Sequence, residues 1–279
     1  MRQALRSAFR VALIASALGH SVNAEQASTV PFELYEGHMI VVKASLVGTD
    51  ITLNVMIDTG ASQSILSSKA ARKTNARRFG IKAGGSAFGS PTKLDRVIVH
   101  GLRFGARTIT MACYSAELPW KNVDLILGLD VLAKSSFTID YAKKEIEFGS
   151  TSRLTHTMRF NRENGLLLVD AGIGSEMYQL SLDSGAPYTC LWQANLGNSL
   201  GLLSTQPATM KSMAGTSDVR TTVLPLFRLG AGEWKELPAW IVIGPTKTGA
   251  ERDGVVGLGS LHFERVRFDF EQGELSWDH

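Results

Sequence analysis

Hydrophobic runs of strand length recur along the chain, and many of them alternate with polar residues. In the first half, β-branched residues dominate residues 39–44 and 51–57. In the second half, residues 165–169 and 177–182 are leucine-rich hydrophobic runs that flank a turn at 172–174. A period of two places one face of a strand in the core and the other toward solvent. The pattern therefore predicts an all-β fold.

Each half is also expected to end in a β-hairpin, and the expected helices are short. Ser67 is a favourable N-cap for one short helix, and a second is expected after Trp192. The hairpins are predicted from 138–141 to 146–148 and from 267–270 to 275–277, with turns at Lys143-Lys144 and Gln272-Gly273.

The two halves of the chain repeat one another. Residues 55–62, Val-Met-Ile-Asp-Thr-Gly-Ala-Ser, resemble residues 180–187, Leu-Ser-Leu-Asp-Ser-Gly-Ala-Pro, at an offset of 125 positions. Further along, Asp-Leu-Ile-Leu-Gly-Leu resembles Asp-Gly-Val-Val-Gly-Leu, and the closing hairpins match, both at an offset of 129 positions. Such self-similarity indicates a duplicated unit. We therefore expect two versions of one unit, a first half over 25–150 and a second half over 151–279.

Residues 1–24 have the pattern of a secretory signal peptide, in which three arginines precede an apolar run and a small-residue cleavage site at 22–24. Without these residues the chain carries 26 basic and 26 acidic residues. Neutrality gives no general reason to expect a nucleic-acid partner. No later run reaches the ~20 apolar residues of a membrane span, so no stable membrane insertion is expected. The product should be periplasmic or secreted.

The motifs Asp58-Thr59-Gly60 and Asp183-Ser184-Gly185 are the strongest candidates for chemistry. Each follows a hydrophobic strand, and each is followed about 70 residues later by two apolar residues and a glycine. One copy alone could be only a turn, because Asp and Gly are common turn residues. The recurrence of the whole arrangement favours a functional pair of aspartates.

This pattern resembles the pepsin/retropepsin superfamily of aspartic proteases over nearly all of the chain after residue 24. It is most similar to exported bacterial retropepsin-like proteases that carry two lobes in one chain. The resemblance implies a bilobal acid-protease fold, in which two homologous β-barrel lobes hold the active site between them. It also implies that Asp58 and Asp183 are catalytic. The residues expected to support them, by hydroxyl hydrogen bonds or by close backbone approach, are Thr59, Gly60, Gly128, Ser184, Gly185 and Gly257.

Two carboxyl groups a few ångströms apart cannot both ionise easily, so they share a proton. The ionised one would take a proton from a water that attacks a peptide carbonyl, and the protonated one would donate to the developing oxyanion. This chemistry needs no metal or other cofactor. Because both aspartates lie in one chain, we expect a monomer.

A flap over the cleft is expected at residues 83–89, where Gly84 and Gly85 would form a hinge and Phe88 replaces the tyrosine usual in pepsins. The alternative is an ordinary glycine-rich hairpin tip. Residues 214–217 could form a second flap. Pro187 is a departure from the family pattern, which often has Ser or Thr after the second motif.

Other candidate chemistry is weaker. None of the six histidines has the spacing of a metal site, and no Gly-x-Ser-x-Gly motif supports a serine hydrolase. Cys113 and Cys190 align in the repeat with the apolar residues Val242 and Ile65, so buried thiols are expected. The acid-free basic segment from Lys69 to Lys82 is expected to be a solvated face, with a docking patch for an anionic partner as the alternative.

These observations predict an exported aspartic endopeptidase whose partner is an extended peptide or protein substrate. Two other functions remain open. One is a relative with the same fold that binds peptides with little or no turnover, and the other is a two-lobed scaffold for another protein. Cleavage of peptides that depends on both aspartates separates the first function from the other two.

Overall fold

A computed structural model describes residues 28–84, 92–149, 151–196, 203–213, 215–243 and 252–279. The signal peptide expected over residues 1–24 lies outside this part of the chain. The described residues form mainly strands, with two short α-helices. The predicted all-β class is confirmed.

The described elements of the first half begin with a strand whose alternate residues are buried, as expected for a half-buried strand. The elements are β1 (Ser28–Tyr35), β2 (Met39–Leu46), β3 (Thr52–Ile57), β4 (Ile65–Ser67), α1 (Ser68–Lys73), β5 (Arg77–Gly84), β6 (Thr92–Phe104), β7 (Arg107–Ala116), β8 (Leu125–Leu127), α2 (Leu129–Leu132), β9 (Phe137–Asp140) and β10 (Glu145–Phe148).

The second half follows a similar order, with short 3-10 helices where the first half has α-helices. Its described elements are β11 (His156–Arg159), β12 (Asn161–Glu163), β13 (Leu166–Ile173), β14 (Glu176–Asp183), β15 (Thr189–Trp192), η1 (Gln193–Asn195), β16 (Gln206–Ser212), β17 (Gly215–Leu229), β18 (Gly232–Val242), β19 (Gly254–Gly257), η3 (Leu258–Ser260), β20 (Arg265–Asp269) and β21 (Glu274–Asp278).

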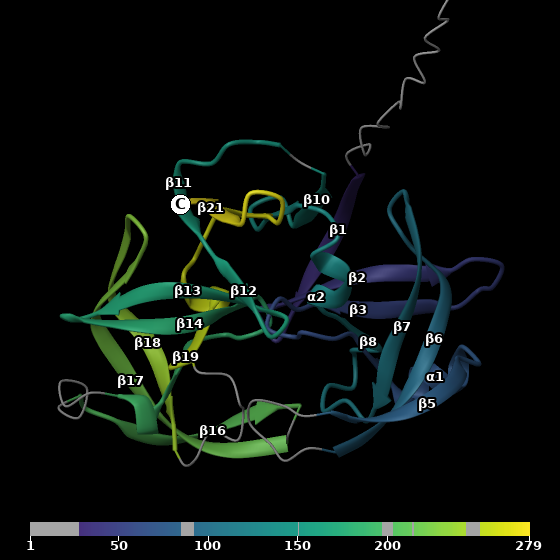
Figure 1. Ribbon diagram of the computed structural model, residues 1–279, viewed down its shortest axis with the longest axis horizontal. Coiled ribbons are helices and arrows are strands. Elements are labelled where there is room, and N and C mark those ends of the chain that lie inside the picture. The colour runs from purple at the N-terminus through teal and green to yellow at the C-terminus, as the bar shows by residue number, and fades with distance from the viewer. Residues whose placement is uncertain (1–27, 85–91, 150, 197–202, 214, 244–251) are drawn as a thin grey trace, which may run out of the picture.

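The strands form two sheets, and part of one sheet joins the two halves. The larger sheet has the order β11-β21-β20-β9-β10-β1-β2-β3-β8-β4-β7-β6-β5, and the smaller has the order β12-β13-β14-β19-β15-β18-β17-β16. Figure 1 shows the first half on the right in purple to teal and the second half on the left in green to yellow. The six strands from β11 to β1 come from both halves, so hydrogen bonds of one sheet connect them.

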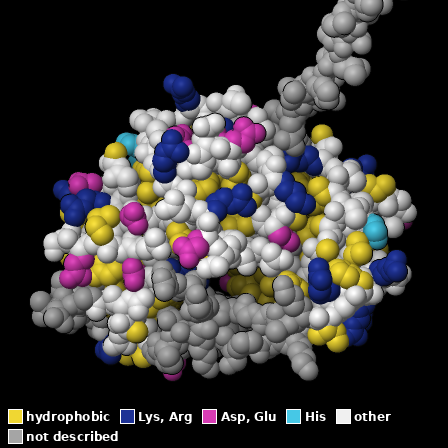
Figure 2. All heavy atoms as spheres, in the orientation of Figure 1, with side chains coloured by type: hydrophobic (Ala, Val, Ile, Leu, Met, Phe, Trp, Pro, Cys, Tyr) yellow, Lys and Arg dark blue, Asp and Glu magenta, His cyan; other side chains and the backbone are white. Residues whose placement is uncertain are grey.

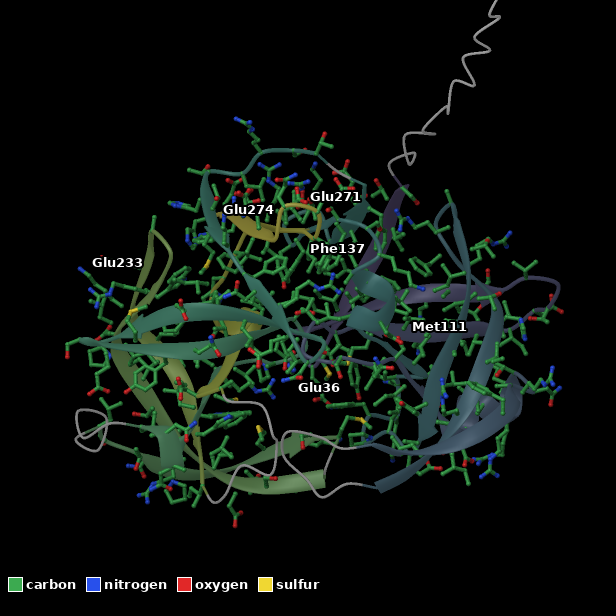
Figure 3. All side chains as sticks on the ribbon, in the orientation of Figure 1. Glu36, Met111, Phe137, Glu233, Glu271 and Glu274 are labelled. Atoms are coloured by element: carbon green, nitrogen blue, oxygen red, sulfur yellow. The ribbon has the colours of Figure 1, made fainter. Side chains whose placement is uncertain are left out.

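The junction between the halves is the antiparallel pair β9–β20. Phe137 lies opposite Phe268, and their rings stack with centroids 5.0 Å apart. Phe137 is fully buried and lies where the halves meet, whereas Met111 lies inside the first half (Figure 3). Burial of large aromatic rings at this point stabilises the association of the two halves.

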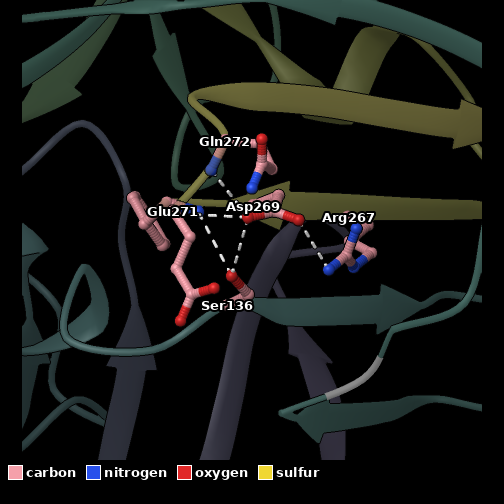
Figure 4. A network of polar contacts seen from close by, with 6 residues as sticks. Ser136, Arg267, Asp269, Glu271 and Gln272 are labelled. Carbon is pink, nitrogen blue, oxygen red and sulfur yellow. Dashed lines mark hydrogen bonds and ion pairs between the residues drawn. The ribbon is translucent and has the colours of Figure 1, made fainter.

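A polar network reinforces the same junction (Figure 4). The carboxylate of Asp269 accepts hydrogen bonds from the Ser136 hydroxyl at 3.2 Å and from the backbone amides of Glu271 and Gln272, each at 3.1 Å. Its other oxygen lies 2.8 Å from the guanidinium of Arg267. Because Ser136 belongs to the first half and Asp269 to the second, the network fixes the two halves relative to each other.

The local predictions agree largely with the structure. Both closing hairpins are confirmed, as β9 with β10 and β20 with β21. Ser67 caps α1, since its hydroxyl accepts the Ala70 amide at 3.0 Å, and the second short helix is the 3-10 helix η1 after Trp192.

Two details of the sequence interpretation are wrong. The predicted turn at 172–174 begins two residues too early, because Gly172 and Ile173 still pair with both β14 and β17, and Ile173 is buried. The alignment of Cys113 with Val242 is also displaced. Parallel pairing places Ile65 opposite Tyr114 and its equivalent Cys190 opposite Trp240. The structural counterpart of Cys113 is therefore Ala239.

Candidate active site

Each of the two aspartates lies where a central strand meets a parallel neighbour. β3 ends at Ile57, opposite Leu127 of β8, and the amide of Asp58 donates to the Leu127 carbonyl at 3.1 Å. In the second half, β14 ends at Asp183, opposite Gly257 of β19. Since both β3 and β14 have a paired strand on each side, the backbone at both aspartates is held in place.

Reciprocal hydrogen bonds join the two aspartate loops. The amide of Thr59 donates to the Ser184 hydroxyl, and the amide of Ser184 donates to the Thr59 hydroxyl, each at 3.0 Å. Each hydroxyl in turn donates across the interface to a backbone carbonyl, of Leu182 at 3.2 Å and of Ile57 at 3.0 Å. Thr59 and Ser184 are 0% and 1% exposed, so the four bonds lie away from water. The loops that hold the aspartates are therefore coupled directly.

Glycine is required where these loops meet. A Cβ atom at Gly60 would lie 2.3 Å from the carboxyl carbon of Asp183, closer than real Cβ contacts allow. A Cβ at Gly185 would lie 2.6 Å from the Met56 methyl and 3.2 Å from the Asp58 carboxyl carbon. Each glycine thus leaves room for the carboxyl group of the opposite half.

The structure brings the carboxyl groups of Asp58 and Asp183 into hydrogen-bonding contact with each other. One oxygen of Asp58 also accepts the amides of Gly60 at 2.8 Å and Ala61 at 3.1 Å, and one oxygen of Asp183 accepts the Gly185 amide at 2.7 Å. Both aspartates keep partial solvent access. These bonds orient the two groups while leaving them open to a reactant.

The electrostatic surroundings of the two carboxyl groups differ. Burial raises the pKa of Asp58 well above its usual range, and the nearby charge of Asp183 raises it further. Burial also raises the pKa of Asp183, but the amide of Gly185 and the positive charge of Arg252 oppose that rise. Asp58 is therefore the favoured holder of the shared proton, and Asp183 is the favoured carboxylate.

Gly128 and Gly257 lie behind the two loops and touch their backbones. A Cβ at Gly128 would lie 2.7 Å from the Ala61 carbonyl oxygen, and one at Gly257 would lie 2.2 Å from that of Tyr188. In the first half the Ser64 hydroxyl also accepts the Gly128 amide at 3.0 Å. Only a residue without a side chain permits this close packing, so both glycines fix the loops from behind.

The predicted flaps fall partly outside the described residues. Gly84 is the last residue of β5 and pairs with Thr92 of β6, whereas Gly85 and Phe88 lie outside the described part of the chain. For the second flap, residues 215–217 begin β17 and pair with β16, and Ala214 is outside that part.

An apolar cluster of the first half lies beside the dyad and was not singled out from the sequence. Its buried members are Met39, Met56, Val123 and Ile126. Met213, at the end of the β16 strand of the second half, packs against this cluster. Figure 2 shows the surface hollowed between the halves, with hydrophobic side chains inside the hollow. The buried cluster and the partly exposed Met213 therefore form an apolar wall beside the site, with Met213 as its accessible part.

The remaining sequence candidates lie elsewhere. Cys113 and Cys190 are free and buried, as predicted, and burial raises the pKa of Cys113 to about 12. In the basic segment, the side chains of Lys69, Arg72 and Arg77 are exposed. Within the described ranges no group of His, Cys, Asp and Glu residues is arranged to hold a metal ion. Of the helices in those ranges, none has the length and apolar character needed to cross a membrane.

Arg252 is a residue of the site that sequence reasoning missed. It precedes β19 and is 6% exposed, and its charge acts on Asp183. The repeat itself contains the signal that could have found it, because the same position of the first half holds Val123. The exchange of a buried valine for an arginine at this position is therefore a difference between the two halves that the sequence alone contains.

Comparisons with known proteins agree with this geometry. Residues 42–134 match the family model described as "gag-polyprotein putative aspartyl protease", a range that includes Asp58 and Gly128. The chain is also similar to Protein DDI1 homolog 1 of Mus musculus, with 30% identity over 105 residues. That similarity covers 37% of this chain and 26% of the mouse protein, so the chain spans about a quarter of the length of this curated relative. Both matches support the aspartic protease superfamily for this chain.

Proposed function

We propose that the protein is an aspartic endopeptidase that hydrolyses peptide bonds with a water molecule activated between Asp58 and Asp183. The observation that carries this proposal is the contact of the two carboxyl groups, which the reciprocal bonds of Thr59 and Ser184 impose. Neither strand end alone could present two titratable groups to one reactant. The site is complete within one chain, which supports a monomeric enzyme.

The roles of the two aspartates follow from their surroundings. The Asp183 carboxylate takes a proton from the water, whose oxygen then attacks the peptide carbonyl carbon. Asp58, which keeps its proton more strongly, donates that proton to the carbonyl oxygen as the tetrahedral intermediate forms. As the C–N bond breaks, the proton held by Asp183 passes to the leaving nitrogen, and the Asp58 carboxylate takes back a proton from a hydroxyl of the tetrahedral intermediate as the new carbonyl forms. The two aspartates exchange roles over one turnover, and the starting protonation state returns after product release.

An extended peptide is the substrate that fits this site. The site lies between two halves that each present a long hairpin, β5–β6 and β16–β17, with backbone groups suited to pair with a strand. Met213, which is partly exposed and packs against the buried cluster of Met39 and Met56, favours apolar side chains beside the cut bond. Methionines adapt easily to different shapes, which supports cleavage of more than one sequence.

The finer assignment is to exported bacterial retropepsin-like proteases with two lobes in one chain. It rests on the pairing of Asp58-Thr59-Gly60 with Asp183-Ser184-Gly185 in one sequence. The arginines and apolar run of residues 1–24 support export, with the mature enzyme acting in the periplasm or outside the cell.

The test is to incubate the purified protein, without residues 1–24, with a diverse peptide mixture over a range of pH in water enriched in heavy oxygen. We expect internal cuts, located by mass spectrometry, with one heavy oxygen atom in each new carboxyl group from the first turnover. The Asp58→Asn and Asp183→Asn proteins should make no such cuts. Tight binding of a peptide in which a hydroxyl carbon replaces the scissile carbonyl would add support, because such a group resembles the tetrahedral intermediate.

Two outcomes would contradict the proposal. Cuts that persist in both asparagine variants would point to a contaminating protease or a different site. Binding of peptides by the wild-type protein with no cuts at any pH would instead favour a peptide-binding relative that has lost turnover.

A further inference from the structure

Arg252 occupies a place where the repeat predicts an apolar residue. The next residue, Asp253, is the equivalent of Asp124, because both carboxylates accept a backbone amide from the matching strand, at 2.8 Å and 3.0 Å. The register therefore aligns Arg252 with Val123, which is 2% exposed in the apolar wall of the site. The two halves place a cation and a methyl-bearing side chain at the same position.

Two of the three guanidinium nitrogens of Arg252 are buried without a hydrogen-bond partner. The residue is 6% exposed, and its Nε and Nη1 atoms are buried with no hydrogen-bond acceptor. No carboxylate of the described residues lies within ion-pair distance of it. The group lies over the ring of Trp192, with its central carbon 6.0 Å from the ring centroid. An aromatic face attracts a cation but accepts none of its five N–H groups in a strong hydrogen bond.

The surroundings place Arg252 beside the dyad. Its charge acts on Asp183, and Arg252 lies two residues before β19, the strand whose last residue, Gly257, is paired with Asp183. Trp192 packs with Cys190 and Val255, and the charge of Asp183 also reaches Cys190. The guanidinium therefore lies against the Trp192 cluster of the second half, within electrostatic reach of Asp183.

A buried cation without a partner destabilises the folded protein, and in most proteins an anion pairs with such a group. Asp183 acts from a distance and is engaged by Asp58 and Gly185, so it does not satisfy the guanidinium. Arginine binds carboxylates through two parallel N–H bonds, which fits an anionic group entering the hollow next to the dyad.

We propose that Arg252 forms a carboxylate-binding subsite, so that the protein selects peptides with a glutamate or aspartate side chain next to the scissile bond. The inference rests on the proposed protease function and adds a substrate class to it. The second half contributes an acidic-residue subsite through Arg252, whereas the first half has the buried apolar residue Val123 at the equivalent position and offers no cation there. A cation on one side alone would orient an extended peptide in one direction.

The experiment compares octapeptides that carry a single Glu or a single Gln at each position around a central apolar cut site. Each peptide is tested with a free carboxylate and with an amide at its C-terminus, which separates a side-chain carboxylate from a terminal one. The proteins are wild type, Arg252→Gln, Arg252→Lys and a matched control, Arg162→Gln. Arg162 also lies over an aromatic ring, 5.8 Å from the centroid of Phe270, but it is exposed.

For the wild-type protein we expect kcat/KM to be at least about tenfold higher for Glu than for Gln at one position, which corresponds to ~1.4 kcal/mol. The ratio should fall to about one in Arg252→Gln, recover in part in Arg252→Lys, and stay unchanged in Arg162→Gln. Thermal unfolding of Arg252→Gln should be no lower than that of wild type, since the substitution removes an unpaired charge. A purely structural arginine would give the opposite result for stability and no change in the ratio.

Binding separates this inference from the proposed function. The Asp58→Asn protein should bind the Glu peptide more tightly than the Gln peptide, and the added Arg252→Gln change should remove the difference. Cleavage without any Glu preference overturns the subsite and leaves the protease intact. Preferential binding of Glu peptides without cleavage by the wild type overturns the protease and leaves the subsite intact. A preference only for the free C-terminus assigns the subsite to a terminal carboxylate and contradicts the side-chain proposal.

Discussion

The two halves of the molecule share a backbone register but differ in the side chains they place around it. Ile65 lies opposite Ile126 in the first half, and their equivalents Cys190 and Val255 lie opposite each other in the second. Yet Val123 in one half corresponds to Arg252 in the other. The backbone is symmetric where the two carboxyl groups meet, and the side chains are asymmetric beside them.

Under the proposed function, the asymmetry has a chemical consequence. Hydrolysis needs one protonated and one ionised carboxyl group, and a peptide has a direction from its N-terminus to its C-terminus. A site with perfect two-fold symmetry would not determine which carboxyl group holds the proton. It would also bind a peptide equally well in either chain direction. Arg252 distinguishes the two aspartates because its charge opposes the rise that burial causes in the pKa of Asp183, and the same charge distinguishes the two ends of the proposed peptide-binding site.

The largest expected effect tests whether both halves are equally necessary. Asp58→Asn and Asp183→Asn should each lower kcat by about 10³-fold or more, because an amide can serve as neither general acid nor general base. Circular dichroism and gel filtration should show that both variants remain folded. The matched controls are the exposed residues Asp50 and Asp170, whose Asn variants should cleave like the wild type. Near-normal turnover by either site variant would break the two-aspartate mechanism.

A second effect compares the glycines behind the loops. Gly257→Ala should destabilise the protein by roughly 3 kcal/mol and Gly128→Ala by ~2 kcal/mol, because the added Cβ meets backbone atoms in both places. The clash is more severe in the second half, at 2.2 Å against 2.7 Å. Urea unfolding measures both values.

The control for this comparison is Gly80→Ala, because the Cβ added there meets nothing closer than a side-chain atom at 4.0 Å. Its stability should change by less than about 0.5 kcal/mol. If Gly128→Ala lowered the free energy of unfolding more than Gly257→Ala did, the backbone of the second half would be the one that shifts more easily to admit the added Cβ.

A third effect tests the hydroxyl bonds between the halves. Ser184→Ala leaves the Thr59 amide and the Ile57 carbonyl of the first half without their partner, and should cost about 1–3 kcal/mol. The cleavage rate should fall as well, because small displacements of reacting groups are costly. Ser184→Thr restores the residue type of the first half and should retain most of the activity. Thermal unfolding and kcat/KM are the measurements, and an unaltered Ser184→Ala protein would contradict the coupling of the two loops.

The parts predicted from sequence are those that local pattern determines. Alternation predicted the strands 39–44 and 51–57, and turn residues predicted the hairpins, because these signals act over a few positions. The motif pair predicted that Asp58 and Asp183 lie together, since each copy carries its own strand and its own glycine. The resemblance to a known superfamily supplied the arrangement of the halves, which local signals do not contain.

The parts that were missed depend on contacts between distant segments. β13 extends to Ile173 because β17 pairs with it, and the residues near 173 contain no local signal that predicts this pairing. Met213 packs beside the dyad from the other half, although it looks like any apolar residue near a strand end. In the sequence, Arg252 cannot be distinguished from an exposed charged residue that precedes a strand, because only the structure shows that it is buried.

The smallest expected effect concerns how stability changes with pH. Because burial and Asp183 raise the pKa of Asp58 above its unfolded value, the folded state favours the protonated form. The stability that this proton contributes is fully present below the unfolded pKa of Asp58 and is lost as the pH rises through the folded pKa. Asn cannot ionise, so the Asp58→Asn protein should gain stability relative to wild type as the pH rises through that range.

The pH dependence of stability should differ between Asp58→Asn and Asp183→Asn, because the carboxyl group that remains has different surroundings in each variant. In Asp58→Asn the remaining Asp183 has Arg252 to support its charge, so its own pKa is raised less and stability should depend less on pH. In Asp183→Asn the remaining Asp58 lacks such a cation, so its burial keeps the pH dependence steeper. Urea unfolding across the acidic range should resolve a difference on the order of 1 kcal/mol. Adding Arg252→Gln to Asp58→Asn should steepen its curve toward that of Asp183→Asn, whereas coinciding curves would mean that the two halves are electrostatically equivalent.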